Sequence, residues 1–427
     1  MFTNAVVGML WDRQLGKGRN SMNSKVSMPF WCVSNRVRDP FGDHVMDPVS
    51  SVEVCTILCQ AREKGLIDYT SAHDDDLVEW DPANSQDDLD SNSEASKTLQ
   101  TIKSKLDKAN LAMKMVTCSL HGNTVFRNGG LTNPDPDIRA LAAQKVMRTI
   151  RIGNLFGAEF LTYWVARDGF ECQFAIPWDR CYGYIENGLN LATRYIKDNK
   201  FSIKAGTIES KPNEPRGEMF LATTGHALAL ISRLEDPAFW NVNPEILQHE
   251  GMANLSAINA IAMAVHAGKL PFFHMGNQKP GQFDNDSPVM TGMDGLKEAI
   301  GVLWMLARAN WKGYIEFDNH MLRTDAAPGK DNSLKLRMEF IEHNAASLRL
   351  AEKKAEQLAN NKVLNQLHAA LCDKPSPLAK ALATYDFKSL SEAKIDYKKL
   401  NQTSAAVAGL DLEFNKAILG LGGLPAE

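Results

Sequence analysis

The feature that most constrains the fold is an alternation of short apolar segments with longer helical segments, repeated eight times along the chain. The segments expected to be strands are 26–33, 66–72, 112–120, 159–166, 201–209, 239–243, 270–275 and 313–318. The segments expected to be helices are 51–64, 94–111, 135–153, 178–199, 224–234, 255–267, 295–309 and 333–355. Eight βα units in a row, with no antiparallel interruption, predict an α/β protein with a (β/α)8 TIM barrel.

The pattern changes on either side of the barrel. Residues 1–24 are polar and form an expected N-terminal extension, and residues 25–355 form the expected catalytic barrel. Residues 356–427 are rich in Lys, Glu, Ala and Leu and hold no series of strands, which predicts a helical C-terminal extension. We interpret this extension as an arm for subunit contacts. A helical cap on the chain's own barrel is the alternative.

Composition excludes several classes of protein. A net charge of −4 gives no reason to expect a nucleic-acid partner. No segment approaches the roughly 20 apolar residues that span a bilayer, and no basic region precedes the short apolar run at the start. The seven cysteines are odd in number and scattered, which favours a reducing cytoplasm over a disulfide framework. We read Cys55 and Cys59 as packed thiols rather than as a metal site.

Polar and aromatic residues recur where the predicted strands end. In a TIM barrel the active site lies at the C-terminal ends of the strands. Acidic side chains and histidines gathered there would repel or desolvate one another without a bound cation. The residues in question are Trp31, His73, Thr117, Trp164, Glu209, Lys211, Glu245, His274 and Asp318.

Two pairs of residues indicate what the site does. Glu209 and Lys211 are two positions apart at a strand end, so both project to one face. A metal ligand beside a cation suits the polarisation of a sugar oxygen. Asp284 and Asp286 are two apart in a loop and can reach one cation together.

Longer motifs carry a resemblance to a known family. The motifs are Arg38-Asp-Pro-Phe-Gly42, His73-Asp-Asp-Asp76-Leu, Val125-Phe-Arg-Asn-Gly-Gly130, Lys211-Pro-Asn-Glu-Pro-Arg-Gly217, Thr224-Gly-His-Ala-Leu228, Asn243-Pro-Glu245, Phe317-Asp318 and Arg323-Thr324. In this order they resemble the xylose isomerases, most closely the shorter, actinobacterial-type class. The similarity runs from about residue 31 to about residue 324.

The resemblance implies roles for individual residues. It implies one divalent cation on Glu209, Glu245 and Asp318, with Glu245 shared with a second cation. It implies that His249, Asp284 and Asp286 hold the second cation. It implies that His73, oriented by Asp76, assists ring opening and that Lys211 polarises the carbonyl oxygen. The residues implied to contact the sugar are Trp31, Trp164, Thr117, His121 and the neighbouring subunit's Phe41.

The chain departs from the family pattern at four positions. His274 stands where the family has a metal-binding Asp, and either binds the cation or is a core or loop histidine. Imidazole suits Mn, Co or Zn better than Mg. One extra residue separates Glu245 from His249, so either His249 or Gln248 faces the second cation. His121 replaces a substrate-packing Phe, and His320 replaces a Lys.

The resemblance therefore implies a metal-dependent aldose–ketose isomerase. The expected reaction converts D-xylose to D-xylulose by a 1,2-hydride shift, with two divalent cations (Mg, Mn or Co) and no spare carboxylate to act as a base. A homotetramer, a dimer of dimers, is expected from the family. The alternatives are an isomerase or epimerase for rhamnose or a ketohexose, and a non-catalytic sugar-binding homologue.

Overall fold

The computed structural model describes residues 22–36, 46–83, 89–90, 92–246, 249–278, 281, 286–289, 295–321, 329–371, 375–405 and 407–421. The chain divides into two compact units. One comprises Ser24–Ala351, and the other contains the residues from Glu352 onward. The finer domain boundaries expected from the sequence stay a prediction.

The first unit is built on a parallel sheet that closes into a barrel. Its order is β8-β6-β4-β3-β2-β1-β11-β10-β9. Between β8 and β9, the Asn243 N–H donates to Ile208 O over 2.8 Å, and the His274 N–H donates to Pro244 O over 3.1 Å. These bonds bridge the two ends of the sheet. The strands are β1 (Lys25–Ser27), β2 (Tyr69–His73), β3 (Ala112–Thr117), β4 (Phe160–Trp164), β6 (Ala205–Glu209), β8 (Trp240–Val242), β9 (Glu245–Ile246), β10 (Phe272–Met275) and β11 (Tyr314–Phe317).

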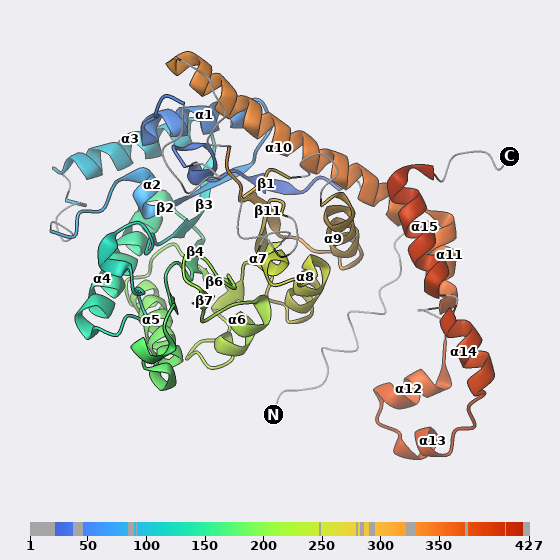
Figure 1. Cartoon of the computed structure of the whole chain (residues 1–427). Helices are drawn as coiled ribbons and strands as arrows, with labels where there is room; N and C mark the ends of the chain where they lie inside the picture. The colour runs from blue at the N-terminus through green and yellow to red at the C-terminus, as the bar shows by residue number, and fades with distance from the viewer. Residues whose placement is uncertain are drawn as a thin grey trace. The chain divides into compact units, whose positions relative to one another are not determined.

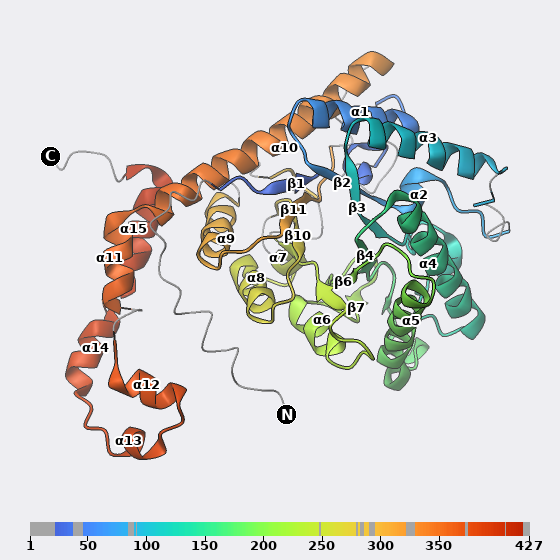
Figure 2. The same ribbon diagram turned by 180° about the vertical axis from the view of Figure 1, so that it is seen from behind.

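Helices surround this ring of strands (Figures 1 and 2). The first of them begins at Ser50, whose side chain caps the helix reciprocally with Glu53. The predicted (β/α)8 TIM barrel is confirmed. The helices are α1 (Ser51–Glu63), α3 (Glu94–Lys108), α4 (Pro136–Phe156), α5 (Trp178–Asp198), α6 (Thr224–Ile231), α8 (Ala257–His266), α9 (Leu296–Arg308) and α10 (Lys330–Ala359), with the one-turn helices α2 (Asp74–Leu77) and α7 (His249–Met252) at the strand ends.

Two details differ from the expectation. The first strand ends at Ser27, because Pro29 has no N–H to donate, and Trp31 lies in the 3-10 helix η1 (Phe30–Val33). The structure also contains an antiparallel pair outside the barrel sheet, which the sequence analysis did not predict. The two-residue strands β5 (Gly169–Phe170) and β7 (Glu218–Met219) form an antiparallel pair in the loops after β4 and β6.

The barrel interior is layered. Tyr69, Phe160, Phe272 and Tyr314 each begin a strand, and their rings pack with centroid distances of 4.8 Å (Phe272–Tyr314), 5.2 Å (Phe160–Phe272) and 5.5 Å (Tyr69–Tyr314). This aromatic layer fills the N-terminal end of the barrel. Since alternate residues of a strand face the same side, residues two and four positions later point into the barrel nearer its C-terminal mouth.

The second unit is helical, which confirms the predicted C-terminal helical extension. Several of its large apolar side chains are exposed, among them Tyr385, Phe387 and Tyr397. Across both units, none of the described helices is long and apolar enough to cross a membrane. The helices of this unit are α11 (Lys362–Leu371), α12 (Pro377–Ala383), α13 (Phe387–Ser391), α14 (Tyr397–Ala405) and α15 (Val407–Leu419).

Candidate metal and sugar site

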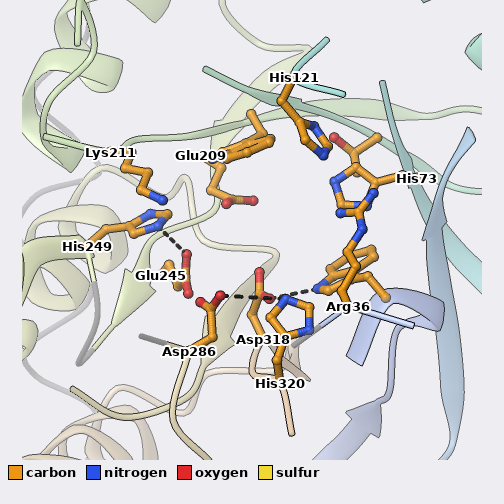
Figure 3. A pocket seen from close by; sticks show the side chains of 13 residues that line it. Arg36, His73, His121, Glu209, Lys211, Glu245, His249, Asp286, Asp318 and His320 are labelled. Carbon is orange, nitrogen blue, oxygen red and sulfur yellow. Dashed lines mark hydrogen bonds and ion pairs between the residues drawn. The ribbon is translucent and has the colours of Figure 1, made fainter. Parts of the chain in front are cut away.

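A cavity with about 670 Å³ of open space lies at the C-terminal mouth of the barrel. Figure 3 shows Glu245, Asp286 and Asp318 around its middle, with His249 and Lys211 on one side and His73 and His121 on the other. The residues that line it are Trp31, Arg36, His73, Thr117, His121, Trp164, Glu209, Lys211, Glu245, His249, Asp286, Asp318 and His320.

Most residues predicted for the site therefore meet in one cavity. Asp76 lies behind His73, and His274 lies beneath the carboxylates of Glu209 and Asp318. Phe41, Gln248 and Asp284 lie outside the described residues.

Four side chains form a compact cluster that fits a divalent cation. Glu209, Glu245, His274 and Asp318 each offer a ligand atom, and these atoms lie within 4.8 Å of one another. The Nδ1 atom of His274 is 2.9 Å from Asp318 Oδ2 and 3.3 Å from Glu209 Oε2. Three carboxylates and one imidazole are ligands that Mn, Co and Zn accept.

The electrostatics of the cluster support the same fit. Burial raises the pKa of Glu209 to about 7, and the nearby Asp318 carboxylate also raises it, against the opposing effect of His274. Burial lowers the pKa of His274, but the carboxylates of Glu209 and Asp318 outweigh it and raise that pKa well above its ordinary value. The carboxylates thus require a positive charge among them, which a divalent cation would supply.

A second set of ligands lies beside Glu245. The Nε2 atom of His249 is 2.6 Å from Glu245 Oε2, and His249 Nδ1 is 2.7 Å from the carbonyl oxygen of Ser210. That carbonyl can only accept, so Nδ1 carries the proton and Nε2 faces Glu245. Asp286 enters the cavity from the loop after β10, with Oδ2 3.6 Å from His320 Nε2. A one-residue insertion before His249 has therefore not turned its ring away from Glu245.

His73 is held by an acidic partner one helical turn away. The Oδ2 atom of Asp76 accepts the main-chain N–H of His73 over 2.9 Å and lies 3.0 Å from its Nδ1. Burial would raise the pKa of Asp76, but the Arg36 guanidinium and His73 hold it below its ordinary value. An ionised Asp76 accepts the Nδ1 proton, which leaves His73 Nε2 as the atom that can act on a ligand.

Asp74, the first acidic residue of this motif, has a structural role. Asp74 is fully buried, and its Oδ2 accepts hydrogen bonds from Lys145 Nζ at 2.7 Å and Arg148 Nη1 at 2.8 Å. Its Oδ1 accepts the Ser119 N–H at 2.8 Å. Asp74 therefore holds the turn after β2 against α4 and against the chain after β3. These bonds fix the position of the main chain at His73.

One wall of the cavity is aromatic. The ring centroids of His121 and Trp164 are 4.9 Å apart, and those of Trp31 and His73 are 4.6 Å apart. Lys211 Nζ lies 5.7 Å from the Trp164 ring. Burial lowers the pKa of His121 well below its ordinary value, as do Arg36 and His73, so this ring is neutral. The wall thus combines the apolar rings of Trp31 and Trp164 with two imidazoles, of which His121 is uncharged.

Sequence reasoning missed two residues that shape the site. Arg36 lines the cavity, with Nη2 3.4 Å from Asp76 Oδ1. Glu316 is fully buried, with Oε1 3.0 Å from His274 Nε2, and the sequence analysis did not name this carboxylate. Glu316 stands two positions before Asp318 on β11, and this period-two spacing was a signal that could have revealed it. Arg36 follows a 3-10 helix and carries no comparable signal.

Comparisons with known proteins identify curated relatives of the chain. No family model matches the chain. Over 300 residues the chain is 33% identical to the xylose isomerase of Thermus thermophilus, covering 70% of this chain and 73% of that protein. It is 34% identical to the xylose isomerase of Thermus caldophilus over the same length and the same shares of the two chains.

Solved structures support the barrel fold. A candidate xylose isomerase from Rhodospirillum rubrum superposes with a TM-score of 0.56 at 13% identity, covering 76% of this chain and 99% of that chain. A D-allulose 3-epimerase from Methylomonas superposes with a TM-score of 0.53 at 15% identity, covering 77% and 96%.

Proposed function

We propose, since this chain belongs to the xylose isomerase family, that its barrel-mouth site interconverts an aldose and its ketose with two divalent cations, and that D-xylose and D-xylulose are the pair it acts on. Membership of the family makes the protein a sugar isomerase or epimerase. The single observation that supports the finer proposal is the cluster of Glu209, Glu245, His274 and Asp318, whose three carboxylates line one cavity with Lys211 and His73.

The ligands divide into two sets that share one residue. Glu209, Glu245, His274 and Asp318 would hold the first cation, and Glu245, His249, Asp284 and Asp286 would hold the second. Cations so held supply Lewis acidity, which stabilises negative charge on two neighbouring sugar oxygens.

The remaining polar groups would handle protons and orientation. His73 Nε2, presented by the bond from Nδ1 to Asp76, would accept the proton that the anomeric hydroxyl loses and pass it to the ring oxygen as the sugar opens. The ammonium of Lys211 would donate a hydrogen bond to the carbonyl oxygen of the open chain. The faces of Trp31 and Trp164 would contact the sugar's C–H groups and exclude water.

A hydride shift suits the carboxylates available. Each described carboxylate that lines the cavity belongs to a proposed ligand set, and Glu316 is buried beneath the cavity against His274. No described carboxylate there is thus left to act as a base at the sugar's C2. Isomerisation in heavy water is expected to leave C1 of the product free of solvent deuterium, and substantial deuterium at C1 would refute the shift.

A second candidate is an isomerase or epimerase for another sugar. The observation that favours it is the polar part of the wall, where neutral His121 and the guanidinium of Arg36 line the same cavity. These groups would suit a sugar with a further hydroxyl at the end away from the cations.

A panel of sugars tests the proposal. Chelated protein reloaded with Mn²⁺ or Co²⁺ is incubated with D-xylose, rhamnose, glucose and several ketohexoses, and products are resolved by NMR. The proposal expects ketose from D-xylose at the highest kcat/KM. A 3-epimer as the main product would favour the second candidate. Sugar binding without any product, with every metal, would favour a non-catalytic homologue.

We further propose that the protein assembles as a homotetramer through its C-terminal unit. The exposed Tyr385, Phe387 and Tyr397 support an arm that packs against another copy.

A further inference from the structure

We infer that Glu316 is a positioning residue, which turns Nδ1 of His274 toward the first cation and so makes this site prefer cations with affinity for nitrogen over Mg²⁺. The inference rests on the proposed cation site. It concerns which atom of His274 faces the cation and what holds it there.

Strand register brings the two residues together. His274 on β10 is paired with Glu316 on β11 and with Glu245 on β9. Both His274 and Glu316 stand two residues beyond the aromatic layer of the barrel, at Phe272 and Tyr314, so both point into the interior. There, His274 Nε2 lies 3.0 Å from Glu316 Oε1. This contact is a consequence of the parallel pairing and depends on no loop.

The hydrogen-bonding capacity of the two groups decides which nitrogen is available. With the cation bound, His274 is neutral and has one proton, and because a carboxylate accepts hydrogen bonds, Glu316 takes that proton on Nε2. Nδ1 then carries the lone pair, and it lies 2.9 Å from Asp318 Oδ2 and 3.3 Å from Glu209 Oε2. A lone pair and two carboxylate oxygens at these distances repel one another unless a positive charge lies among them.

Asn243 offers a competing arrangement. Its Nδ2 lies 3.0 Å from His274 Nε2 and 3.2 Å from Glu209 Oε2. If the amide donated to Nε2, the proton would sit on Nδ1 and block the cation. The bond from Nε2–H to a carboxylate is the stronger of the two, because one partner is charged. The Nε2–H of His274 therefore donates to Glu316, and the Asn243 amide donates to Glu209 instead.

Burial separates this role from direct catalysis. Glu316 is 0% exposed and does not line the cavity, so it reaches a ligand only through His274. Groups that orient a metal-bound histidine typically change metal affinity 10–100-fold when removed. An imidazole ligand favours Mn²⁺, Co²⁺ and Zn²⁺, whereas Mg²⁺ prefers oxygen.

The test measures metal binding in the full-length protein, without turnover. Wild type, Glu316→Gln, His274→Asp and the double variant are titrated with Co²⁺, Mn²⁺ and Mg²⁺ against a chromophoric chelator. Visible spectra of the Co²⁺ forms are recorded in parallel. Thr162→Val is the matched control, because it removes a buried barrel hydrogen bond, 2.7 Å to Thr207, outside the cluster.

We expect Glu316→Gln to weaken Co²⁺ binding about 10-fold or more with little change for Mg²⁺, and to alter the Co²⁺ spectrum. His274→Asp should remove the preference for Co²⁺, and Glu316→Gln should add nothing to it. Thr162→Val should leave the Co²⁺/Mg²⁺ affinity ratio unchanged even if it lowers Tm.

Other outcomes separate the claims. An unchanged affinity ratio and spectrum in Glu316→Gln would overturn the inference, as would a wild type that prefers Mg²⁺. Either result would leave the proposed isomerase standing if Mg²⁺ or Mn²⁺ still supports ketose formation. Failure of wild type to bind any divalent cation would instead remove the proposed function.

Discussion

The indole Nε1 of Trp31 donates a hydrogen bond to Oδ1 of Asp318 over 2.7 Å, joining residues 287 positions apart in the chain. Trp31 follows the first strand of the barrel and Asp318 follows the last, and β1 and β11 are neighbours in the closed sheet. One side chain thus lines the cavity and orients a candidate metal ligand, so closure of the barrel and assembly of the site are linked.

Replacing Trp31 by Phe tests this link. The change keeps an aromatic wall but removes the N–H that holds Asp318. We expect affinity for the first Mn²⁺ to fall about 10-fold, in the range seen when a hydrogen bond to a metal ligand is lost. Isothermal titration of chelated protein measures it. Equal affinity in wild type and variant would mean that Asp318 needs no such partner.

Asp76→Asn tests the orientation of His73. An amide can donate as well as accept, so the His73 ring is no longer held with its proton on Nδ1. We expect kcat/KM for D-xylose to fall about 100-fold, the lower end for loss of a positioned proton donor. Glyceraldehyde, which has no closed ring to open, is the control substrate and should be far less affected. An equal loss for both sugars would contradict a role in ring opening.

Lys211→Met removes the charge while retaining a long side chain against Trp164. The proposed role, stabilising the oxygen on which charge develops, predicts a loss of about 10²–10³ in kcat. Affinity for Mn²⁺ should stay within a few-fold of wild type, because Lys211 is not a proposed ligand. Stopped assays for ketose measure kcat, beside a titration with Mn²⁺. An unchanged kcat would contradict the proposed role of Lys211.

Metal binding should depend on pH through Glu209. Its pKa is raised to about 7 by burial, so in the metal-free protein it is protonated below that pH. A cation must displace this proton and also the extra proton that the raised pKa of His274 retains, so affinity should rise with pH through about 7. Calorimetry in buffers of different ionisation enthalpy should detect more protons released on binding at pH 6 than at pH 8. The same affinity at both pH values would contradict this.

The same pKa shift sets a stability trend with a definite sign. Because the pKa of Glu209 is higher in the folded protein than when unfolded, the folded state holds its proton more tightly. The proton on Glu209 contributes fully to the stability of the folded protein at pH values below the pKa of Glu209 in the unfolded chain. The contribution is lost as pH rises through about 7. Glu209→Gln should flatten that part of the stability curve of chelated protein, measured by urea unfolding.

The exposed side chains of the C-terminal unit test the proposed assembly. Phe387 is 77% exposed and Tyr397 is 76% exposed. Changing both to Ser should lower the mass measured by light scattering at a fixed protein concentration. The control is Phe174→Ser, since Phe174 is 98% exposed but lies in a barrel loop. A mass unaltered by the double change would exclude these residues from the subunit interface.

The barrel could be predicted from the sequence because each strand is short and apolar and is followed by a segment with helical periodicity. The first strand, which was expected to be much longer than it is, shows the limit of this reasoning. Residues 26–33 are apolar apart from Ser27, but Pro29 ends the strand pairing, and Trp31 lies in a 3-10 helix. The break between β8 and β9 at Pro244 has the same kind of cause.

The site was accessible where motifs and strand ends coincide, as at Glu209 and His73. Glu316 was not predicted, because in the sequence it resembles any alternating residue of a buried strand. Its role depends on which residue of β10 lies beside it. His274 in place of an Asp was visible as a departure, but its partner was not. Pairings across strands are set by register, which no single segment of sequence reveals.

The most direct test of a two-cation isomerase is a Mn²⁺ titration of chelated protein, with binding and D-xylose turnover followed on the same samples. The account predicts no ketose without metal, a rise in turnover that is complete at two bound Mn²⁺ per chain, and loss of both binding steps in Glu245→Gln. Ketose formation that survives complete chelation, or saturation at one ion with Glu245→Gln unaffected, would contradict it.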